Sequence, residues 1–187
     1  MLVLLHGLGL DREMWQAQCD ALSDSFAVIA IDAFGHGLSP APPPELTLQH
    51  LVHQVVGVLD HAEVERAVVA GFDLGGQTAL AISARAAQRV AGVALISTAY
   101  RRLKAQRDML LTRIDQARRH GPAANADSAI QRWFSAAFQG EERTRVRAIR
   151  DRIASNDPSG YIAASQLYAY ADVETADDVR NIRAPML

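Results

Sequence analysis

Four short apolar runs restrict the fold of this chain more than any other feature. They lie at Leu2–Leu5, Phe26–Ile31, Ala67–Ala70 and Val90–Ile96. Each run is almost continuously apolar, which is typical of a strand buried on both faces of a sheet. Segments whose apolar residues recur at helical spacing separate the runs. This alternation predicts an α/β fold, in which helices cover both faces of a parallel sheet.

Three helices are predicted between these strands. Their apolar residues recur at helical spacing over Arg12–Leu22, Thr47–Asp60 and Leu74–Ala87. Thr47 carries the short hydroxyl side chain that a helix N-cap prefers. The second helix is therefore expected to begin directly after it.

The pattern changes after the fourth strand. Residues 101–178 show only helical periods, which we interpret as a helical insertion that forms a cap over the sheet. The predicted organisation is a core over residues 1–99, a cap over residues 100–178 and a return to the core over residues 179–187.

Both ends of the chain fall within or beside a predicted strand. Met1 lies almost inside the first run, and Pro185–Leu187 read as the first residues of a further strand. Because strands usually run about five or six residues, we expect the chain to be truncated at both ends. An incomplete sheet leaves an unpaired edge, which favours self-association.

Composition narrows the function classes. Of the 187 residues 49% are hydrophobic and the net charge is −2, so we expect a packed core and no overall attraction to nucleic acid or membrane. No apolar run approaches the roughly 20 residues that span a bilayer and no signal peptide is evident, so a cytoplasmic protein is expected. Cys19 is the only cysteine, which excludes an internal disulfide or a thiolate zinc cluster. No phosphate-loop, dinucleotide or metal-ligand motif is present, so no cofactor and no metal are expected.

The sequence Ala-Gly-Phe-Asp-Leu-Gly-Gly at residues 70–76 is typical of a strand, a sharp turn and the start of a helix. In such a turn a Gly-x-Ser-x-Gly motif places a nucleophilic serine at the apex, but the apex residue here is Asp73. Gly71, Gly75 and Gly76 suit a turn whose apex is strained and whose neighbours pack closely. The aspartate either replaces a serine nucleophile, attacks as a carboxylate itself, or belongs to a turn without chemistry.

Four signals, taken in order, resemble the α/β-hydrolase family. They are His6–Gly9 after the first strand, Asp32–Ser39 after the second, Gly71–Gly76 after the third and the helical cap after the fourth. Three later stretches resemble the cap and exit of 3-oxoadipate enol-lactonase-like hydrolases: Arg132–Phe134, Asn156–Tyr161 and Asp178–Pro185. The resemblance covers essentially the whole chain.

The resemblance implies a hydrolase of small carboxylic esters or enol lactones. Asp73 would stand at the nucleophile position, and the backbone N–H groups of Leu8 and Leu74 would form the oxyanion hole. In this family the catalytic acid and then the histidine follow the nucleophile along the chain, and both are expected beyond Leu187. A carboxylate is also a poor nucleophile for acyl transfer. We therefore expect little turnover by this chain.

Two alternatives stay open. Asp73 is the true nucleophile if the chain resembles haloalkane dehalogenases or epoxide hydrolases, in which a carboxylate forms an alkyl ester that water then cleaves. Those relatives usually carry proline where this chain has Gly9, and the dehalogenases often carry tryptophan where it has Leu74. The other alternative is a non-catalytic remnant that binds a ligand or partner.

Further residues are candidates for the pocket. His6 and His36 follow strands at the same sheet edge as the sharp turn at Gly71–Gly76, which is called the elbow below, although a structural role in the loops is the commoner outcome for such residues. Asp32 is expected to brace the loop that follows it. Trp133 and Phe134 have the helical spacing of core aromatics, and we expect one of the two to face the substrate pocket.

Overall fold

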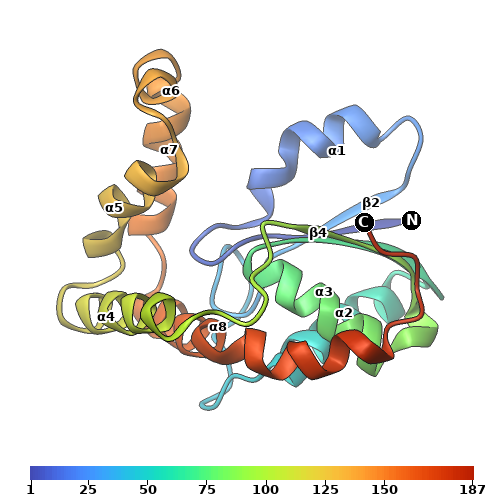
Figure 1. Cartoon of the computed structure of the whole chain (residues 1–187). Helices are drawn as coiled ribbons and strands as arrows, with labels where there is room; N and C mark the ends of the chain where they lie inside the picture. The colour runs from blue at the N-terminus through green and yellow to red at the C-terminus, as the bar shows by residue number, and fades with distance from the viewer.

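The computed structural model describes residues 1–187 and has an α/β architecture (Figure 1). Its strands are β1 (Leu2–Leu5), β2 (Val28–Ile31), β3 (Ala67–Phe72) and β4 (Val90–Ile96). They form one sheet in the order β2-β1-β3-β4, and every neighbouring pair is parallel. The fold class predicted from the alternating pattern is confirmed.

The helices occupy the segments that the periodicity indicated. They are α1 (Gln16–Leu22), α2 (Leu48–His61), α3 (Leu74–Arg85), α4 (Lys104–His120), α5 (Ala123–Trp133), α6 (Ala136–Glu141), α7 (Arg143–Ala154) and α8 (Pro158–Asp178), with short 3₁₀ turns at Arg12–Trp15, Ala87–Arg89 and Val179–Asn181. Helix α1 lies on one face of the sheet, and α2, α3 and the C-terminal half of α8 lie on the other (Figure 1). No helix combines the length and apolarity that crossing a membrane requires.

Helix α2 shows how the sequence builds the core. Its apolar stripe is buried against the sheet, and Leu48 and Leu59 belong to the same cluster as Val3 of β1 and Val69 of β3. The hydroxyl of Thr47 accepts the backbone N–H of His50 and caps the helix as predicted. The stripe fixes which face of the helix packs, and the cap fixes where the helix begins.

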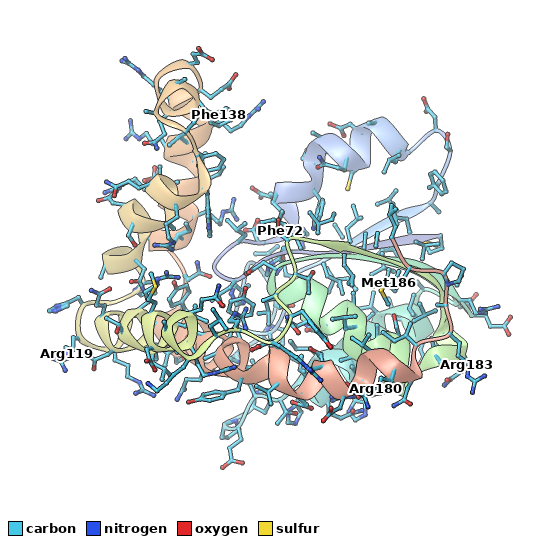
Figure 2. The ribbon with its side chains drawn as sticks, viewed as in Figure 1. Phe72, Arg119, Phe138, Arg180, Arg183 and Met186 are labelled. Carbon is cyan, nitrogen blue, oxygen red and sulfur yellow. The ribbon has the colours of Figure 1, made fainter.

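The last residues of the chain add to the sheet beside β4. Met186 forms a parallel bridge with Val93, the Val93 N–H donates to the Pro185 carbonyl at 2.9 Å, and the Leu187 N–H donates to the Val93 carbonyl at 3.0 Å. Met186 lies close under the sheet in Figure 2. The structure thus has an isolated bridge, and not a full strand, where the start of a strand was predicted, and these residues cover part of the outer edge of β4.

All regular elements between β4 and the last residues of the chain are helices. Helices α4 to α7, the helical insertion that is called the cap below, stand beside the sheet, and α6 lies farthest from α2 and α3 (Figure 1). Helix α8 connects the two layers, because Tyr161 at its start packs against Gly9 whereas Ala171 further along belongs to the core cluster under the sheet. Side chains of α8 therefore reach both the cap and the strand ends.

Candidate active site

Asp73 forms a sharp turn between β3 and α3. Its backbone has φ 55° and ψ −109°, a region that residues other than glycine rarely adopt. The turn is held by its neighbours, because the Asp73 N–H donates to the Ile96 carbonyl at 3.1 Å and the Gly75 N–H donates to the His6 carbonyl at 3.0 Å. The strained apex is therefore fixed by the strands on both sides of β3.

The glycines of the turn allow this close packing. A Cβ atom added to Gly71 would overlap the carbonyl oxygen of Gly75, and one added to Gly75 would overlap the carbonyl oxygen of Leu5. Both obstacles are backbone atoms that cannot swing aside. At Gly76 the obstacle is the side chain of Thr98. Helix α3 can thus begin directly against the ends of β1 and β3.

The Asp73 carboxylate occupies the position expected for an oxyanion. Its Oδ2 accepts the backbone N–H of Leu8 at 3.1 Å, and the N–H of Leu74 lies near enough to the carboxylate to lower its pKa. The hydroxyl of Tyr168 donates to the other oxygen, Oδ1. Of the two donors that the resemblance assigned to the oxyanion hole, Leu8 is therefore already bonded to the side chain at the nucleophile position, and Leu74 lies beside it.

The surroundings change the acidity of both partners. Desolvation raises the pKa of Asp73, and it outweighs the hydrogen bonds from Tyr168, Leu8 and Leu74 together with the nearby charge of Arg102. Burial and the Asp73 charge raise the pKa of Tyr168, so its hydroxyl keeps its proton and remains a donor. Asp73 is consequently a weaker acid than a free aspartate.

A buried cluster of charged side chains, Arg102, Asp172 and Arg107, packs against Tyr168. The guanidinium of Arg102 stacks on the Tyr168 ring, 4.0 Å from its centroid, and pairs with Asp172 at 2.8 Å. Arg107 also pairs with Asp172, at 3.3 Å. Burial alone would raise the pKa of Asp172, but the Arg102 backbone N–H and the two guanidinium groups outweigh it and hold that pKa below its usual range.

A cavity of about 530 Å³ opens above Asp73, between the strand ends and the cap. Its lining mixes apolar side chains with a cationic set and one carboxyl group. The charged lining residues are Asp73, Arg102, Arg113 and Arg132. Burial lowers the pKa of Arg132, and the positive charge of Arg113 lowers it further. The cavity is suited to a small ligand with negative or partially negative oxygen atoms.

Only one of the two candidate aromatics lines this cavity. Trp133 at the end of α5 is part of the lining. Phe134 instead stacks on Phe138 with 5.1 Å between ring centroids, and Phe138 lies on α6 in the part of the cap away from the sheet (Figure 2). The peptide after Trp133 leaves the helix, so neighbouring residues point to different surroundings.

His6 and His36 do not line the cavity, which corrects their assignment as pocket residues. Both are buried, and Nε2 accepts a backbone N–H in each: from Ala33 at 2.9 Å for His6 and from Gly9 at 3.1 Å for His36. Burial lowers the pKa of His6 to about 4, with a further contribution from His36, and burial also lowers the pKa of His36. The two neutral rings hold the loops after β1 and β2.

Asp32 braces the loop after β2, as predicted. Its carboxylate accepts the backbone N–H of Arg12 at 2.7 Å and that of Leu38 at 3.0 Å. Its buried position at the strand end leaves it no access to the cavity. The side chain therefore ties the segment before α1 to the loop that follows β2.

Sequence reasoning missed Tyr168, Arg102 and Asn125, which all line the cavity. Tyr168 had a usable signal, because it lies two helical turns after Tyr161 and shares its face of α8. Arg102 had none, since its direction depends on the loop after β4. Asn125 lies in a polar stretch of α5 that gives no indication of its burial.

Comparison with known proteins agrees with this geometry. The model of the family described as alpha/beta hydrolase fold matches residues 1–133. The 3-oxoadipate enol-lactonase 1 of Acinetobacter baylyi is 30% identical over 186 residues, which cover 100% of this chain and 68% of that protein. The 3-oxoadipate enol-lactonase 2 of the same organism is 28% identical over 186 residues, again with 100% and 68% coverage.

Two solved structures are similar over almost the whole chain. The enol-lactonase from Burkholderia xenovorans LB400 has a TM-score of 0.91 and 34% sequence identity, covering 99% of this chain and 70% of that one. A malate-bound thermophilic esterase from Thermogutta terrifontis has a TM-score of 0.89 and 28% identity, covering 99% and 68%. The likeness therefore extends through the cap as well as the sheet.

Proposed function

The chain belongs to the alpha/beta hydrolase fold family and is related to enol-lactonases and esterases, and from this premise we propose that its cavity binds small carboxylic esters or lactones. The carbonyl group of the ligand would lie at the elbow, above Asp73. The names of the relatives support this ligand class, and the malate-bound esterase supports oxygen-rich acids as occupants of such a cavity.

One observation carries the proposal. The backbone N–H groups of Leu8 and Leu74 converge on a single carboxylate at the floor of the cavity. Donors in this arrangement can equally donate to the oxygen of a carbonyl group that becomes negative during attack, and one such donor is typically worth about 3 to 4 kcal/mol in the transition state. The site is therefore built for acyl chemistry at an ester or lactone.

Asp73 keeps turnover low in this proposal. Its own carboxylate holds the donors that a substrate oxygen would need, and it brings no hydroxyl with which to form an acyl ester. None of the six histidines of the chain lines the cavity, so the lining supplies no imidazole base. The chain as it stands binds its ligand more readily than it converts it.

The carboxylate-nucleophile alternative is less well supported. An attacking carboxylate needs an oxygen free to approach carbon, but Oδ2 of Asp73 is bonded by Leu8 and Oδ1 by Tyr168. For the partner-binding alternative, Pro185–Leu187 already pair with the outer edge of β4. The enol-lactonase relatives also favour ester or lactone chemistry over both.

The test compares the chain with Asp73→Ser and Asp73→Asn. Serine frees the oxyanion donors and supplies a hydroxyl, whereas asparagine removes the charge without supplying one. We expect short esters and γ-lactones to raise the Tm of all three proteins. Only Asp73→Ser should hydrolyse an activated ester measurably, roughly 10³-fold above the rate in water, which oxyanion donors and binding provide without a complete triad.

Two results would overturn the proposal. One is the absence of ester or lactone binding by all three proteins. The other is a covalent alkyl ester on Asp73 after incubation with an epoxide or alkyl halide, detected by peptide mass mapping, because this would make the carboxylate a true nucleophile.

A further inference from the structure

Four large apolar side chains are exposed together on the outer face of α4 and α8. They are Leu103 at the start of α4, Leu111 within α4, and Tyr170 and Val173 of α8, and each is between 39% and 70% exposed. None of them lines the cavity above Asp73. Scattered apolar residues on a surface need no explanation, but a contiguous group is typical of an interaction site. These four residues are called the α4–α8 strip below.

Contacts between the two helices bring the members of the strip together. Arg107 lies one helical turn from both strip residues of α4, and its guanidinium lies 5.1 Å from the centroid of the Tyr170 ring. The Arg102 backbone N–H donates to Asp172 Oδ2 at 2.6 Å, so the first strip residue of α4 lies near Val173. The two helices are neighbours that run in opposite directions (Figure 1).

The two helices differ strongly in charge. Helix α8 contains four carboxylate side chains and no lysine or arginine. Helix α4 contains five lysine or arginine side chains and two carboxylates. The strip therefore lies on a face with one cationic and one anionic side.

One charge of each sign borders the strip at the same end. Lys104 follows Leu103, and Glu174 follows Val173. The side chains of Lys104 and Glu174 are exposed, so both can reach a molecule that covers the strip. Such a molecule must be apolar at its centre, with a cation and a carboxylate beside the apolar part.

A second copy of the chain has this chemistry. A two-fold axis parallel to the helix pair would place α4 of each copy on α8 of the other. Because Leu103 and Val173 lie at the same level of the helix pair, this rotation brings Leu103 of each copy onto Val173 of the other. Lys104 and Glu174 then meet beside them, and each attractive contact occurs twice.

We propose that the chain forms a two-fold dimer through the α4–α8 strip. The strips of the two copies pack against each other, and Lys104 of each copy pairs with Glu174 of the other. The strip is separate from the cavity lining, so this proposal goes beyond the proposed function and does not depend on it. The outer edge of β4 is not needed, since Pro185–Leu187 already pair with part of it.

Sedimentation of the wild-type chain over a range of concentrations is the first measurement. The average mass should rise from 20.3 kDa towards twice this value, with a Kd of the order of micromolar. A mass that stays at 20.3 kDa up to about 1 mM chain would overturn the dimer.

Val173→Glu tests which face is used. A carboxylate in the centre of the strip should weaken the dimer at least roughly tenfold, because the charge would be buried between apolar side chains. Leu38→Glu is the matched control, since Leu38 is 81% exposed on the loop after β2. It should leave the Kd unchanged, and equal Kd values for the two variants would overturn the role of the strip.

A charge exchange tests the two-fold arrangement. Lys104→Glu and Glu174→Lys should each weaken the dimer roughly tenfold, because like charges then meet twice. In a mixed dimer of the two variants, both contacts join opposite charges again. Fluorescently labelled Lys104→Glu chain should therefore bind Glu174→Lys with about the wild-type Kd.

Glu65→Lys is the control for the exchange. Glu65 is exposed in the turn before β3, and its substitution changes the net charge by the same amount as Glu174→Lys. The labelled Lys104→Glu chain should bind Glu65→Lys more weakly than it binds Glu174→Lys. Equal binding to the two would reflect only overall charge and overturn the pairing of Lys104 with Glu174.

Discussion

The hydroxyl of Tyr168 donates a hydrogen bond to Oδ1 of Asp73, across 95 positions of the sequence. The contact joins α8 to the turn between β3 and α3, so two segments that are distant in the sequence meet at one carboxyl group. A hydrogen bond to the charged form of an acid lowers its pKa, and here it acts against the desolvation that raises the pKa of Asp73. The acidity of the elbow therefore depends on the position of α8.

Removal of this hydroxyl should make Asp73 a still weaker acid. In Tyr168→Phe the ring remains in contact with Arg102 while the donor to Asp73 is lost. We expect the pKa of Asp73 to rise above its wild-type value. The measurement is a pH titration of the Asp73 side-chain carboxyl carbon by ¹³C NMR.

Tyr170→Phe provides the control for this change. Tyr170 lies on the same helix, is 54% exposed and contacts Arg107 instead of Asp73. Its loss of a hydroxyl should leave the Asp73 titration where it is in the wild type. An unchanged or lowered pKa in Tyr168→Phe would refute the contribution of this hydrogen bond.

Asp172 should be among the most sensitive positions on α8. It is fully buried and neutralises both Arg102 and Arg107. Asp172→Asn keeps the shape but leaves two guanidinium groups without a counter-charge, so we expect a loss of about 3 to 5 kcal/mol in the free energy of unfolding.

Urea unfolding measures this loss, and Asp177→Asn on the same helix is the control. Asp177 is exposed, and its substitution should change stability by no more than about 0.5 kcal/mol. A similar small change in both variants would contradict a structural role for the cluster of Arg102, Asp172 and Arg107.

The sheet and its helices could be predicted because local patterns determine them. The strands are almost continuously apolar, and α2 has a stripe of buried apolar side chains that begins after the N-cap residue Thr47. The elbow has glycines at the positions where a side chain would overlap backbone atoms. Strand β3 continued past Ala70 to Phe72, because Gly71 and Phe72 pair with β4, and this pairing is not visible in the apolar pattern.

The cavity could not be predicted in the same way, because its walls come from segments that only tertiary packing brings together. Arg101 and Arg102 are adjacent and chemically identical, yet the first is exposed whereas the second is held by Asp172. His6 was correctly assigned to the sheet edge, but the backbone N–H of Ala33 determines where its ring points. The direction of such side chains depends on hydrogen-bond and ion-pair partners that are distant in the sequence.

Two glycines in helices, Gly75 at the start of α3 and Gly57 in α2, predict opposite effects of the same substitution. In Gly75→Ala the new methyl group would overlap the backbone of Leu5, so we expect a loss of roughly 1 to 3 kcal/mol in stability. Gly57 also lies within a helix, but nothing surrounds its Cβ position. Gly57→Ala should therefore stabilise the chain by about 0.5 to 1 kcal/mol, because alanine is the better helix former.

Thermal or urea unfolding of the two alanine variants decides this point. The sign of the change matters more than its size, since both variants add one methyl group to a helix. A Gly75→Ala protein as stable as the wild type would mean that α3 can move away from β1 without cost.

The pair of buried histidines predicts how stability depends on pH. His6 and His36 lie with ring centroids 5.1 Å apart, and each uses Nε2 to accept a backbone N–H. If Nε2 of either ring were protonated, its N–H would point at the backbone N–H that it now accepts. Protonation of both rings would also place two positive charges next to each other. The fold therefore keeps both rings neutral, which agrees with the lowered pKa values of both.

The direction of the effect follows from the pKa of His6, about 4 in the fold and 6.5 as the reference for the unfolded chain. Below pH 6.5 the unfolded state takes up more protons, so the contribution of His6 is complete above this pH and is lost as the pH falls towards 4. The loss amounts to about 3 kcal/mol for His6. Urea unfolding across this range should show a shallower pH slope for His6→Gln than for the wild type. His53→Gln, at an exposed position of α2, is the control and should keep the wild-type slope. If the slope of His6→Gln is as steep as that of the wild type, the acid sensitivity belongs to other groups.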